Sequence, residues 1–318
     1  LFLRTTEFLW QEGHCAHATH QESQERVQWA IEMYAQIYRD FLALPGIIGK
    51  KSESEKFAGG DATLTYEVLM PEGKALQGCT SHDLGQNFSK AQGIKFQDKQ
   101  GQSQFVWQNS WGFTTRAIGA LLMAHGDDAG LVLPPKVASI QVVIIPVTQD
   151  GEVLVAAHKV AKELGDLRVK VDTRDGESLG YKINKWELRG VPLRIEVGQK
   201  EIASGKFKMV RRDTGEVVEG KVPEILEQIQ ADMLAKQEKF LAENTHEATD
   251  YEEFKKIMEN QRGFIKAFWC ENAECESRIK EETKASTRCL PLDAREENGK
   301  CVYCNQTAKH KWLFALAY

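Results

Sequence analysis

The chain has 318 residues, 42% of them hydrophobic, and its 41 basic and 46 acidic side chains give a net charge of −5. This length exceeds what one ordinary core organises and predicts two or three domains. The charge excludes a basic nucleic-acid coat protein, although a large enzyme can still contact RNA through a local patch. The sequence contains no apolar run long enough to indicate a membrane span.

The chain begins with LFLR, without an initiator methionine and without the charged leader and apolar run of a secretory signal. These residues read like the interior of a strand. We therefore expect the sequence to be the downstream part of a longer protein.

Residues 7–14 (EFLWQEGH) predict a strand with a period of two. One face of this strand carries Phe8, Trp10, Glu12 and His14. The set makes a poor core, because an unpaired buried carboxylate is costly. It suits a small cationic or zwitterionic ligand, since the carboxylate can pair with an ammonium group and the indole can cover an apolar ring. A partly solvated sheet face is the alternative.

Residues 75–88 (ALQGCTSHDLGQNF) place side-chain amides, hydroxyls and an imidazole around two glycines. This composition predicts a loop that wraps a polar ligand with many hydrogen bonds. The signal is weak by itself, because polar glycine loops are common.

Residues 105–125 predict a strand that enters a helix at Thr114 or Thr115, both suitable N-caps. The apolar stripe of this helix is Ile118, Leu121, Leu122 and His125, and Gly126 ends it. Arg116 lies in the first turn, where a cation is unfavourable against the helix dipole. We therefore expect an anionic partner such as a triphosphate, with a surface ion pair as the alternative.

A second block follows an apolar run with a Pro-Pro stop at 130–135, which predicts a strand end. Residues 139–146 predict a strand buried on both faces. A helix at 152–164, a strand at 168–172, a helix at 179–188 and strands at 193–197 and 206–212 come next. The βαβαββ order predicts a small mixed sheet with helices on its faces, and a long helix from Pro223 to about Glu243 leads to a third block.

The third block contains four closely paired cysteines: Cys270 and Cys275 in CENAEC, and Cys301 and Cys304 in CVYC. Two tight turns joined by a longer loop suit a tetrahedral Zn²⁺ site. Buried or disulfide-linked thiols are the alternative, and Cys289 in the loop could replace one ligand. Reduced thiols with zinc indicate the cytosol.

Several of these segments resemble prolyl-tRNA synthetase, a class II aminoacyl-tRNA synthetase. Residues 2–14 (FLRTTEFLWQEGH) resemble the loop and second strand of its motif 2, residues 77–88 its adenosine and proline loop, and residues 110–135 its motif 3. WELRGVPLR at 186–194 resembles the anticodon-binding domain. The cysteine module and the final FALAY resemble the zinc module of the eukaryote- and archaeon-like branch. The resemblance covers the whole chain, with the motifs in order.

The resemblance implies an α/β fold in three domains. These are a partial class II catalytic domain with an antiparallel sheet and helices at 1–138, an α/β anticodon-binding domain with a mixed sheet at 139–240, and a C-terminal α+β zinc-binding domain at 241–318. It also implies ATP-dependent activation of L-proline to prolyl-adenylate, with Mg²⁺, and transfer to tRNA(Pro). For the full-length protein it implies a cytoplasmic homodimer.

The resemblance also assigns residues. The ATP site comprises Arg4, Phe8, Gln77, Thr80 and Arg116, with Arg4 and Arg116 acting catalytically on the phosphates. The proline pocket comprises Trp10, Glu12, His14, His82, Trp111 and Thr114. Glu187, Arg194 and Lys200 contact the anticodon, and Cys270, Cys275, Cys301 and Cys304 hold structural zinc. No catalytic base is assigned, because positioning and cations on the phosphates suffice.

Other expectations concern the ends of the chain and the second block. Motif 1 and the first strand of motif 2 do not appear in the sequence; if these residues are missing from the molecule itself, we expect no adenylate synthesis. The carboxylate of Tyr318 is expected to reach the active site. The basic stretch Lys206, Lys208, Arg211 and Arg212 fits an RNA contact or a solvated strand face. A non-catalytic synthetase-like RNA-binding or regulatory protein and a free-standing zinc-containing tRNA-binding module are the other candidate functions.

Overall fold

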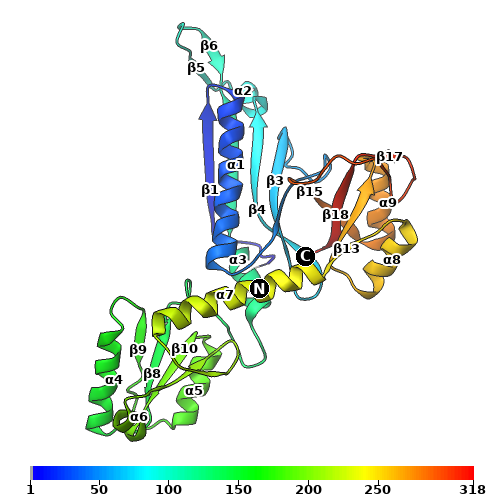
Figure 1. Ribbon diagram of the computed structural model, residues 1–318. Helices are drawn as coiled ribbons and strands as arrows, with labels where there is room; N and C mark the ends of the chain where they lie inside the picture. The colour runs from blue at the N-terminus through cyan, green and yellow to red at the C-terminus, as the bar shows by residue number, and fades with distance from the viewer. Residues whose placement is uncertain (1–2) are drawn as a thin grey trace. The chain divides into compact units, whose positions relative to one another are not determined.

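The computed structural model describes residues 3–318; Leu1 and Phe2, where the motif 2 resemblance begins, lie outside the described residues. The chain divides into two compact units (Figure 1). The first comprises the chain up to Arg39, then Leu44–Ala120 and Glu238–Tyr318; the second comprises Asp40–Ala43 and Leu121–Gln237. Every helix in the described part is too short or too polar to cross a bilayer.

One sheet organises the first unit. Within residues 3–318 it has nine strands in the order β1-β7-β4-β3-β2-β15-β18-β14-β13. The N-terminal half of the sheet contains β1 (Trp10–His17), β7 (Trp107–Thr114), β4 (Lys74–Gly85), β3 (Ala62–Leu69) and β2 (Ile47–Lys50). The C-terminal half contains β15 (Ala285–Pro291), β18 (His310–Ala317), β14 (Phe264–Trp269) and β13 (Thr245–Glu247). The cysteine module therefore continues the sheet of the N-terminal region.

The strands of this sheet are antiparallel neighbours except for β13 with β14. An additional parallel pairing joins the end of β18 to the start of β4. The two halves of the sheet therefore meet twice, at β2 with β15 and at β4 with β18.

Helix α1 (His20–Gln36) covers one face of β1, β7 and β4 (Figure 1). It starts with a capping box, in which Thr19 Oγ1 accepts from the backbone N–H of Glu22 and the Glu22 carboxylate accepts from that of Thr19. Its apolar side, with Ala30, Ile31 and Tyr34, is buried against the sheet. A π-helical turn, Ile37–Phe41, follows.

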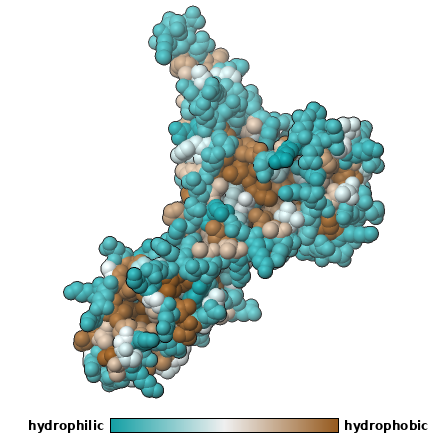
Figure 2. All heavy atoms as spheres, viewed as in Figure 1, coloured by the Kyte–Doolittle hydropathy of each residue, from teal (hydrophilic) through white to brown (hydrophobic). Residues whose placement is uncertain are grey.

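Short elements complete the first unit. They are α2 (Asn87–Gln92), the hairpin β5 (Lys95–Gln97) with β6 (Ser103–Phe105), α8 (Tyr251–Asn260), α9 (Ala273–Thr283), and the hairpin β16 (Gly299–Lys300) with β17 (Thr307–Ala308). Hydrophilic residues cover the β5–β6 hairpin in Figure 2. The C-terminal core gathers around Phe254, Trp269, Ile279 and Phe314, between its strands and helices.

The second unit contains a five-stranded mixed sheet of order β12-β11-β10-β8-β9. Its elements are β8 (Val142–Pro146), α4 (Gly151–Glu163), β9 (Val169–Val171), α5 (Leu179–Leu188), β10 (Leu193–Val197), α6 (Gln199–Ser204), β11 (Lys208–Arg211) and β12 (Val217–Val218). Strands β9, β8 and β10 are parallel, whereas β11 and β12 are antiparallel additions. This arrangement confirms the predicted βαβαββ sheet; α6 and β12 were not predicted. Two helices, α3 (Arg116–His125) and α7 (Val222–Glu243), run from one unit into the other.

The structure corrects three local predictions. Most of residues 75–88 form strand β4 and not a loop, because their hydroxyl and imidazole groups bond to side chains of β3 and β4. Residues 131–135 form no strand; the N–H groups of Leu131 and Leu133 donate to Leu188 and Gly190 in a loop. In α3, Ile118 is 46% exposed while Leu121 is buried, so the predicted apolar stripe is wrong at Ile118.

Candidate active site

The registers of β1 with β7 and of β7 with β4 bring six predicted side chains onto one face of the sheet, because directly opposed residues in an antiparallel pair project to the same side. These residues, here called the ligand face, are Trp10, Glu12, His14, Thr80, His82 and Thr114. Gly112 pairs with both Glu12 and Thr80, so the centre of the face carries no side chain.

The ligand face is open. Trp10 is 53% exposed and Phe8, just before β1, is 50% exposed; their rings meet edge to face at 5.9 Å. Glu12 Oε1 lies 3.3 Å from His14 Nε2. Two large exposed aromatic rings beside a carboxylate are unusual for a merely solvated sheet face and indicate a surface that a ligand covers.

A cavity of about 340 Å³ adjoins this face, a volume within the range of small-molecule sites. It is lined by all five predicted ATP-site residues, namely Arg4, Phe8, Gln77, Thr80 and Arg116. Trp10 and Thr114 of the ligand face also line it. Glu12, His14 and His82 lie on the same face beyond the cavity lining.

Arg116 is the first residue of α3, and Thr114 Oγ1 accepts from its backbone N–H at 3.2 Å. Its guanidinium donates only to main-chain oxygens, to Leu3 at 3.1 Å and Gln77 at 3.2 Å. In residues 3–318 no carboxylate pairs with it, which argues against the surface ion pair. Burial, and then the nearby charge of Arg4, lower the pKa of Arg116.

Arg4 faces the same cavity, and its guanidinium donates to the main-chain oxygen of Tyr318. The main chain of Tyr318 therefore lies beside Arg4, although Tyr318 is not among the residues that line this cavity; that its carboxylate reaches the active site stays a prediction. Among residues 3–318 no Asp or Glu side chain pairs with Arg4 or Arg116, and two guanidinium groups beside one cavity favour an anionic ligand.

His82 is held by two hydroxyls: Thr63 Oγ1 lies 3.0 Å from Nδ1 and Thr80 Oγ1 lies 3.0 Å from Nε2. Burial lowers the pKa of His82 to about 4, so the imidazole is neutral at pH 7. The ring of Phe57 lies 4.8 Å from it and is 46% exposed. Sequence reasoning missed Phe57, because it comes from the segment between β2 and β3, which carries no pattern that points to this face.

Trp111 does not lie on the ligand face, and its assignment to the proline pocket stays a prediction that the register does not support. It pairs with Gly13 and Ser81, one residue out of phase with the ligand face. Its ring covers Gly13, where an added Cβ would lie 2.1 Å away, and meets Trp29 of α1 edge to face at 6.2 Å. Trp111 therefore belongs to the packing between sheet and helix.

The four paired cysteines form a cluster whose sulfur atoms all lie within 4.8 Å of one another. Cys270 Sγ is 3.6 Å from Cys275 Sγ and 3.7 Å from Cys304 Sγ. Four ligands at the Zn–S length of about 2.3 Å in a tetrahedron would be about 3.8 Å apart, so the cluster fits zinc. All seven cysteines are free, which contradicts disulfides, and Cys289 is buried in another cluster with Leu313.

The predicted anticodon residues are only partly brought together. Arg194 Nη1 donates to Glu187 Oε1 at 2.7 Å, and its Nε donates to Glu196 Oε1 at 3.0 Å. Lys200 lies exposed in α6 and, within the described residues, makes no ion pair with either. Glu187 and Arg194 thus form an ion pair between the last turn of α5 and the start of β10.

The basic stretch after β10 is neutralised within the second unit. The ion pairs are Lys206–Glu219, Lys208–Glu196, Arg211–Asp213, Arg211–Asp232 and Arg212–Asp127. Because each cation already has a carboxylate partner, this stretch fits a solvated strand face better than an RNA contact.

Comparison with known proteins adds family information. Residues 2–125 match the family described as tRNA synthetase class II core domain (G, H, P, S and T). Residues 141–232 match the anticodon binding domain, and residues 251–318 match the family described as prolyl-tRNA synthetase, C-terminal.

Individual relatives match along the whole chain. A proline–tRNA ligase of Clostridium novyi (strain NT) is 47% identical over an alignment of 326 positions, gaps included, which covers 100% of this chain and 68% of that protein. A proline–tRNA ligase of Lachnoclostridium phytofermentans is 46% identical over 325 residues, with the same coverage of 100% and 68%. One of Flavobacterium johnsoniae is 46% identical over 333 residues, covering 100% of this chain and 67% of that protein.

Proposed function

Because this chain belongs to the prolyl-tRNA synthetase family, we propose that its ligand face binds L-proline and that the adjoining cavity binds ATP. The chain carries the class II core of a proline–tRNA ligase and has that function. One observation carries the site proposal: Arg4 and Arg116 face a single cavity beside the ligand face, and their side chains donate to main-chain oxygens.

ATP lies in the cavity with its phosphates toward Arg4 and Arg116. Phe8 stacks on the adenine, and Gln77 and Thr80 contact the nucleotide. A proline carboxylate oxygen attacks the α-phosphate, and the two guanidinium groups stabilise the charge that develops on the phosphates. Mg²⁺ bound with ATP would supply further charge neutralisation.

L-Proline lies against Trp10, whose indole covers the pyrrolidine ring. The Glu12 carboxylate pairs with the cyclic ammonium, and His14 at 3.3 Å orients that carboxylate. His82 is neutral because burial lowers its pKa to about 4, so it holds the Thr80 hydroxyl in place without repelling the ammonium. Thr114 closes the face beside Trp10.

The remaining assignments extend this proposal to tRNA. Glu187, Arg194 and Lys200 contact the anticodon; an arginine can take the O6 and N7 edge of guanine and a carboxylate can accept from its N–H groups. We assign residues 1–138 to the catalytic domain, 139–240 to the anticodon-binding domain and 241–318 to the zinc-binding domain.

Zinc held by Cys270, Cys275, Cys301 and Cys304 stabilises the C-terminal module, and free thiols suit the cytoplasm, where we place the protein. We propose that the full-length protein, with the motif 1 region that builds the dimer interface in this family, is a homodimer. Light scattering during size-exclusion chromatography tests this assembly; a monomer at micromolar concentration contradicts it.

Calorimetric titration of the full chain with ATP tests the nucleotide site. Arg116→Gln should weaken ATP binding about thirty- to hundred-fold, since a charge-assisted hydrogen bond contributes roughly 2–3 kcal/mol. Arg278→Gln is the matched control, because Arg278 is exposed on α9 and pairs only with Glu281. The alternative, a non-catalytic RNA-binding or regulatory protein, predicts that the unchanged chain binds no ATP.

A further inference from the structure

A second cavity, of about 480 Å³, shares Leu3, Arg4, Gln77 and Arg116 with the nucleotide cavity. Its other wall comes from the C-terminal module, at β15 and the end of α9. Among the residues that line the second cavity, the proposed function gives a role only to residues that line both cavities. The residues of the C-terminal module that line the second cavity therefore have no role in it yet.

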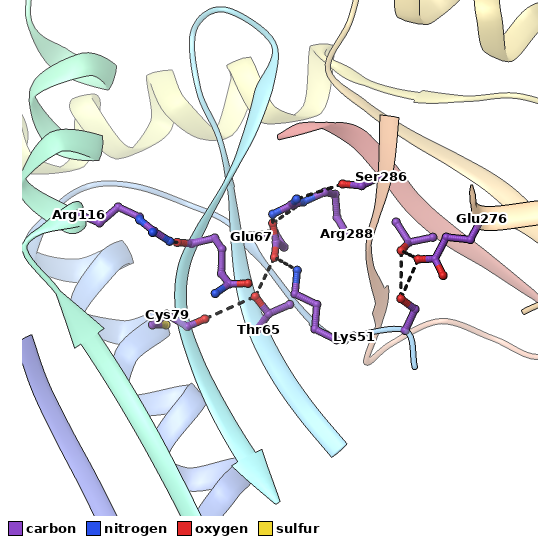
Figure 3. A network of polar contacts seen from close by, with 11 residues as sticks. Lys51, Thr65, Glu67, Cys79, Arg116, Glu276, Ser286 and Arg288 are labelled. Atoms are coloured by element: carbon purple, nitrogen blue, oxygen red, sulfur yellow. Dashed lines mark hydrogen bonds and ion pairs between the residues drawn. The ribbon is translucent and has the colours of Figure 1, made fainter. Parts of the chain in front are cut away.

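Two buried cations in this cavity share one carboxylate, as Figure 3 shows. Lys51 Nζ lies 2.8 Å from Glu67 Oε1, and Arg288 Nη2 lies 2.7 Å from Glu67 Oε2. Lys51 is 3% exposed, Arg288 is 6% exposed and Glu67 is fully buried. The other partners are neutral: Thr65 donates to Glu67, and Ser286 accepts from Arg288.

The other cations of the lining are also poorly compensated. Lys280 pairs with Glu55 at 3.1 Å, and Lys284 donates to a main-chain oxygen. The cationic side chains of the lining are Arg4, Lys51, Arg116, Lys280, Lys284 and Arg288. Six cations against two carboxylates, Glu55 and Glu67, leave an excess of four positive charges.

Such an excess of positive charge around one cavity favours a polyanion, because a multiply charged anion can pair with several of these cations at once. We infer that this second cavity binds inorganic pyrophosphate, and that Lys280, Lys284 and Arg288 of the C-terminal module hold it. The inference rests on the proposed function, which supplies the anion.

The reaction delivers pyrophosphate to this place. When a proline carboxylate oxygen bonds to the α-phosphorus, the bond from that phosphorus to the oxygen bridging to the β-phosphate breaks. The electron pair leaves with the pyrophosphate. Arg4 and Arg116 line both cavities, so the leaving anion passes from one cavity to the other without losing its cationic partners.

Calorimetric titration of the full chain with sodium pyrophosphate, at fixed ionic strength, tests the inference. The double variant Lys280→Ala, Lys284→Asn should bind pyrophosphate about ten-fold more weakly, since each lysine contributes an ionic contact in a partly solvated site. Asparagine is chosen at position 284 because its φ of 64° is left-handed. Arg278→Ala on the same helix removes a charge outside the cavity and should change the affinity less than two-fold.

Three results would overturn the inference. The first is an equal affinity for pyrophosphate in the double variant and in the Arg278 control, and the second is that sulfate binds as tightly as pyrophosphate. The third is that a short CCA oligonucleotide binds more tightly than pyrophosphate and depends on the same two lysines. The last result would make the cavity an RNA site. Separate titrations with ATP and L-proline test the proposed function. If neither ligand binds, the proposed function is wrong, while the pyrophosphate titrations of the double variant and of the Arg278 control still decide whether the second cavity binds pyrophosphate.

Discussion

Among single residues, Glu12 combines a charge with an exposed position on a strand. Its carboxylate lies 3.3 Å from the His14 imidazole and faces the same side as Trp10. A carboxylate in this position contributes little to folding, because exposed ion pairs contribute little. We therefore expect the Glu12 carboxylate to contribute to ligand binding and not to folding stability.

Glu12→Gln should therefore weaken L-proline binding about ten- to hundred-fold, because a hydrogen bond to a charged partner contributes roughly 1.5–3 kcal/mol. The free energy of unfolding should change by less than about 0.5 kcal/mol, as for other surface substitutions. Calorimetry and urea denaturation measure the two effects. Glu32→Gln, an exposed change on α1, is the control. Unchanged proline affinity would rule out the assigned role of Glu12.

His82 links the site to pH. Burial lowers the pKa of His82 from 6.5 to about 4, so between these pH values the imidazole is protonated in the unfolded chain but neutral in the folded chain. The contribution of His82 to the free energy of unfolding is therefore fully present above pH 6.5 and decreases as the pH falls toward 4. His82→Gln should reduce this loss by about 1–2 kcal/mol. Urea denaturation at pH 7 and pH 5 measures it; an identical loss in the variant would contradict the assignment.

At this scale the sequence predicted most of the ligand face but not all of it. Trp10, Glu12 and His14 follow from the period of one strand, which is local information. Trp111 lies on the opposite face of the sheet from the other predicted residues. The pairing of β7 with β1 decides which face each residue of β7 occupies, and the sequence around Ser110 and Gly112 does not show this pairing. Phe57 reaches His82 from a different part of the chain, which no local pattern reveals.

At the scale of the elements, a close contact between β1 and β7 supports the packing of α1 on the sheet. Gly13 of β1 leaves space for the Trp111 ring of β7, which in turn meets Trp29 of α1. Glycine is required here by this close approach, since an added Cβ would lie 2.1 Å from the ring.

Gly13→Ala should lower the free energy of unfolding by about 1–3 kcal/mol through overpacking. Gly151→Ala, where an added Cβ meets nothing within 4 Å, is the control and should be neutral or slightly stabilising. Urea denaturation measures both. If the two variants have equal stability, the ring does not occupy this position.

Elements with strong periodicity were predicted well, and polar elements were not. Helix α5 and strand β10 have the predicted bounds, because apolar residues mark them clearly. Strand β4 was taken for a loop, because its polar side chains find partners only when β3 is paired beside it. Helix α1 was not predicted; its sequence is polar and its apolar side is short.

For the whole molecule, the cysteine cluster belongs to the C-terminal core. Cys275 and Cys301 are buried beside Ile279 and Trp312 in one cluster, so a metal bound there holds α9 against the strands. The sequence predicted that these four cysteines come together, but not that their module extends the sheet of the N-terminal region.

Elemental analysis should find about one zinc per chain, and Cys304→Ala should lose it. Cys289→Ala should retain zinc, because Cys289 lies in β15 with Leu313 and outside the cluster. Chelation should lower the midpoint of thermal unfolding by several degrees, since a structural metal contributes directly to folding. Zinc loss from the Cys289 variant, or an unchanged midpoint after chelation, would contradict this assignment.

The pairing of β2 with β15 has a consequence for the order in which the protein matures. During synthesis, β2 leaves the ribosome long before β15 exists, and until then its outer edge has no neighbour. An unpaired edge can recruit strands from other nascent chains. Truncated products that end before β15 should therefore aggregate more readily than the whole chain.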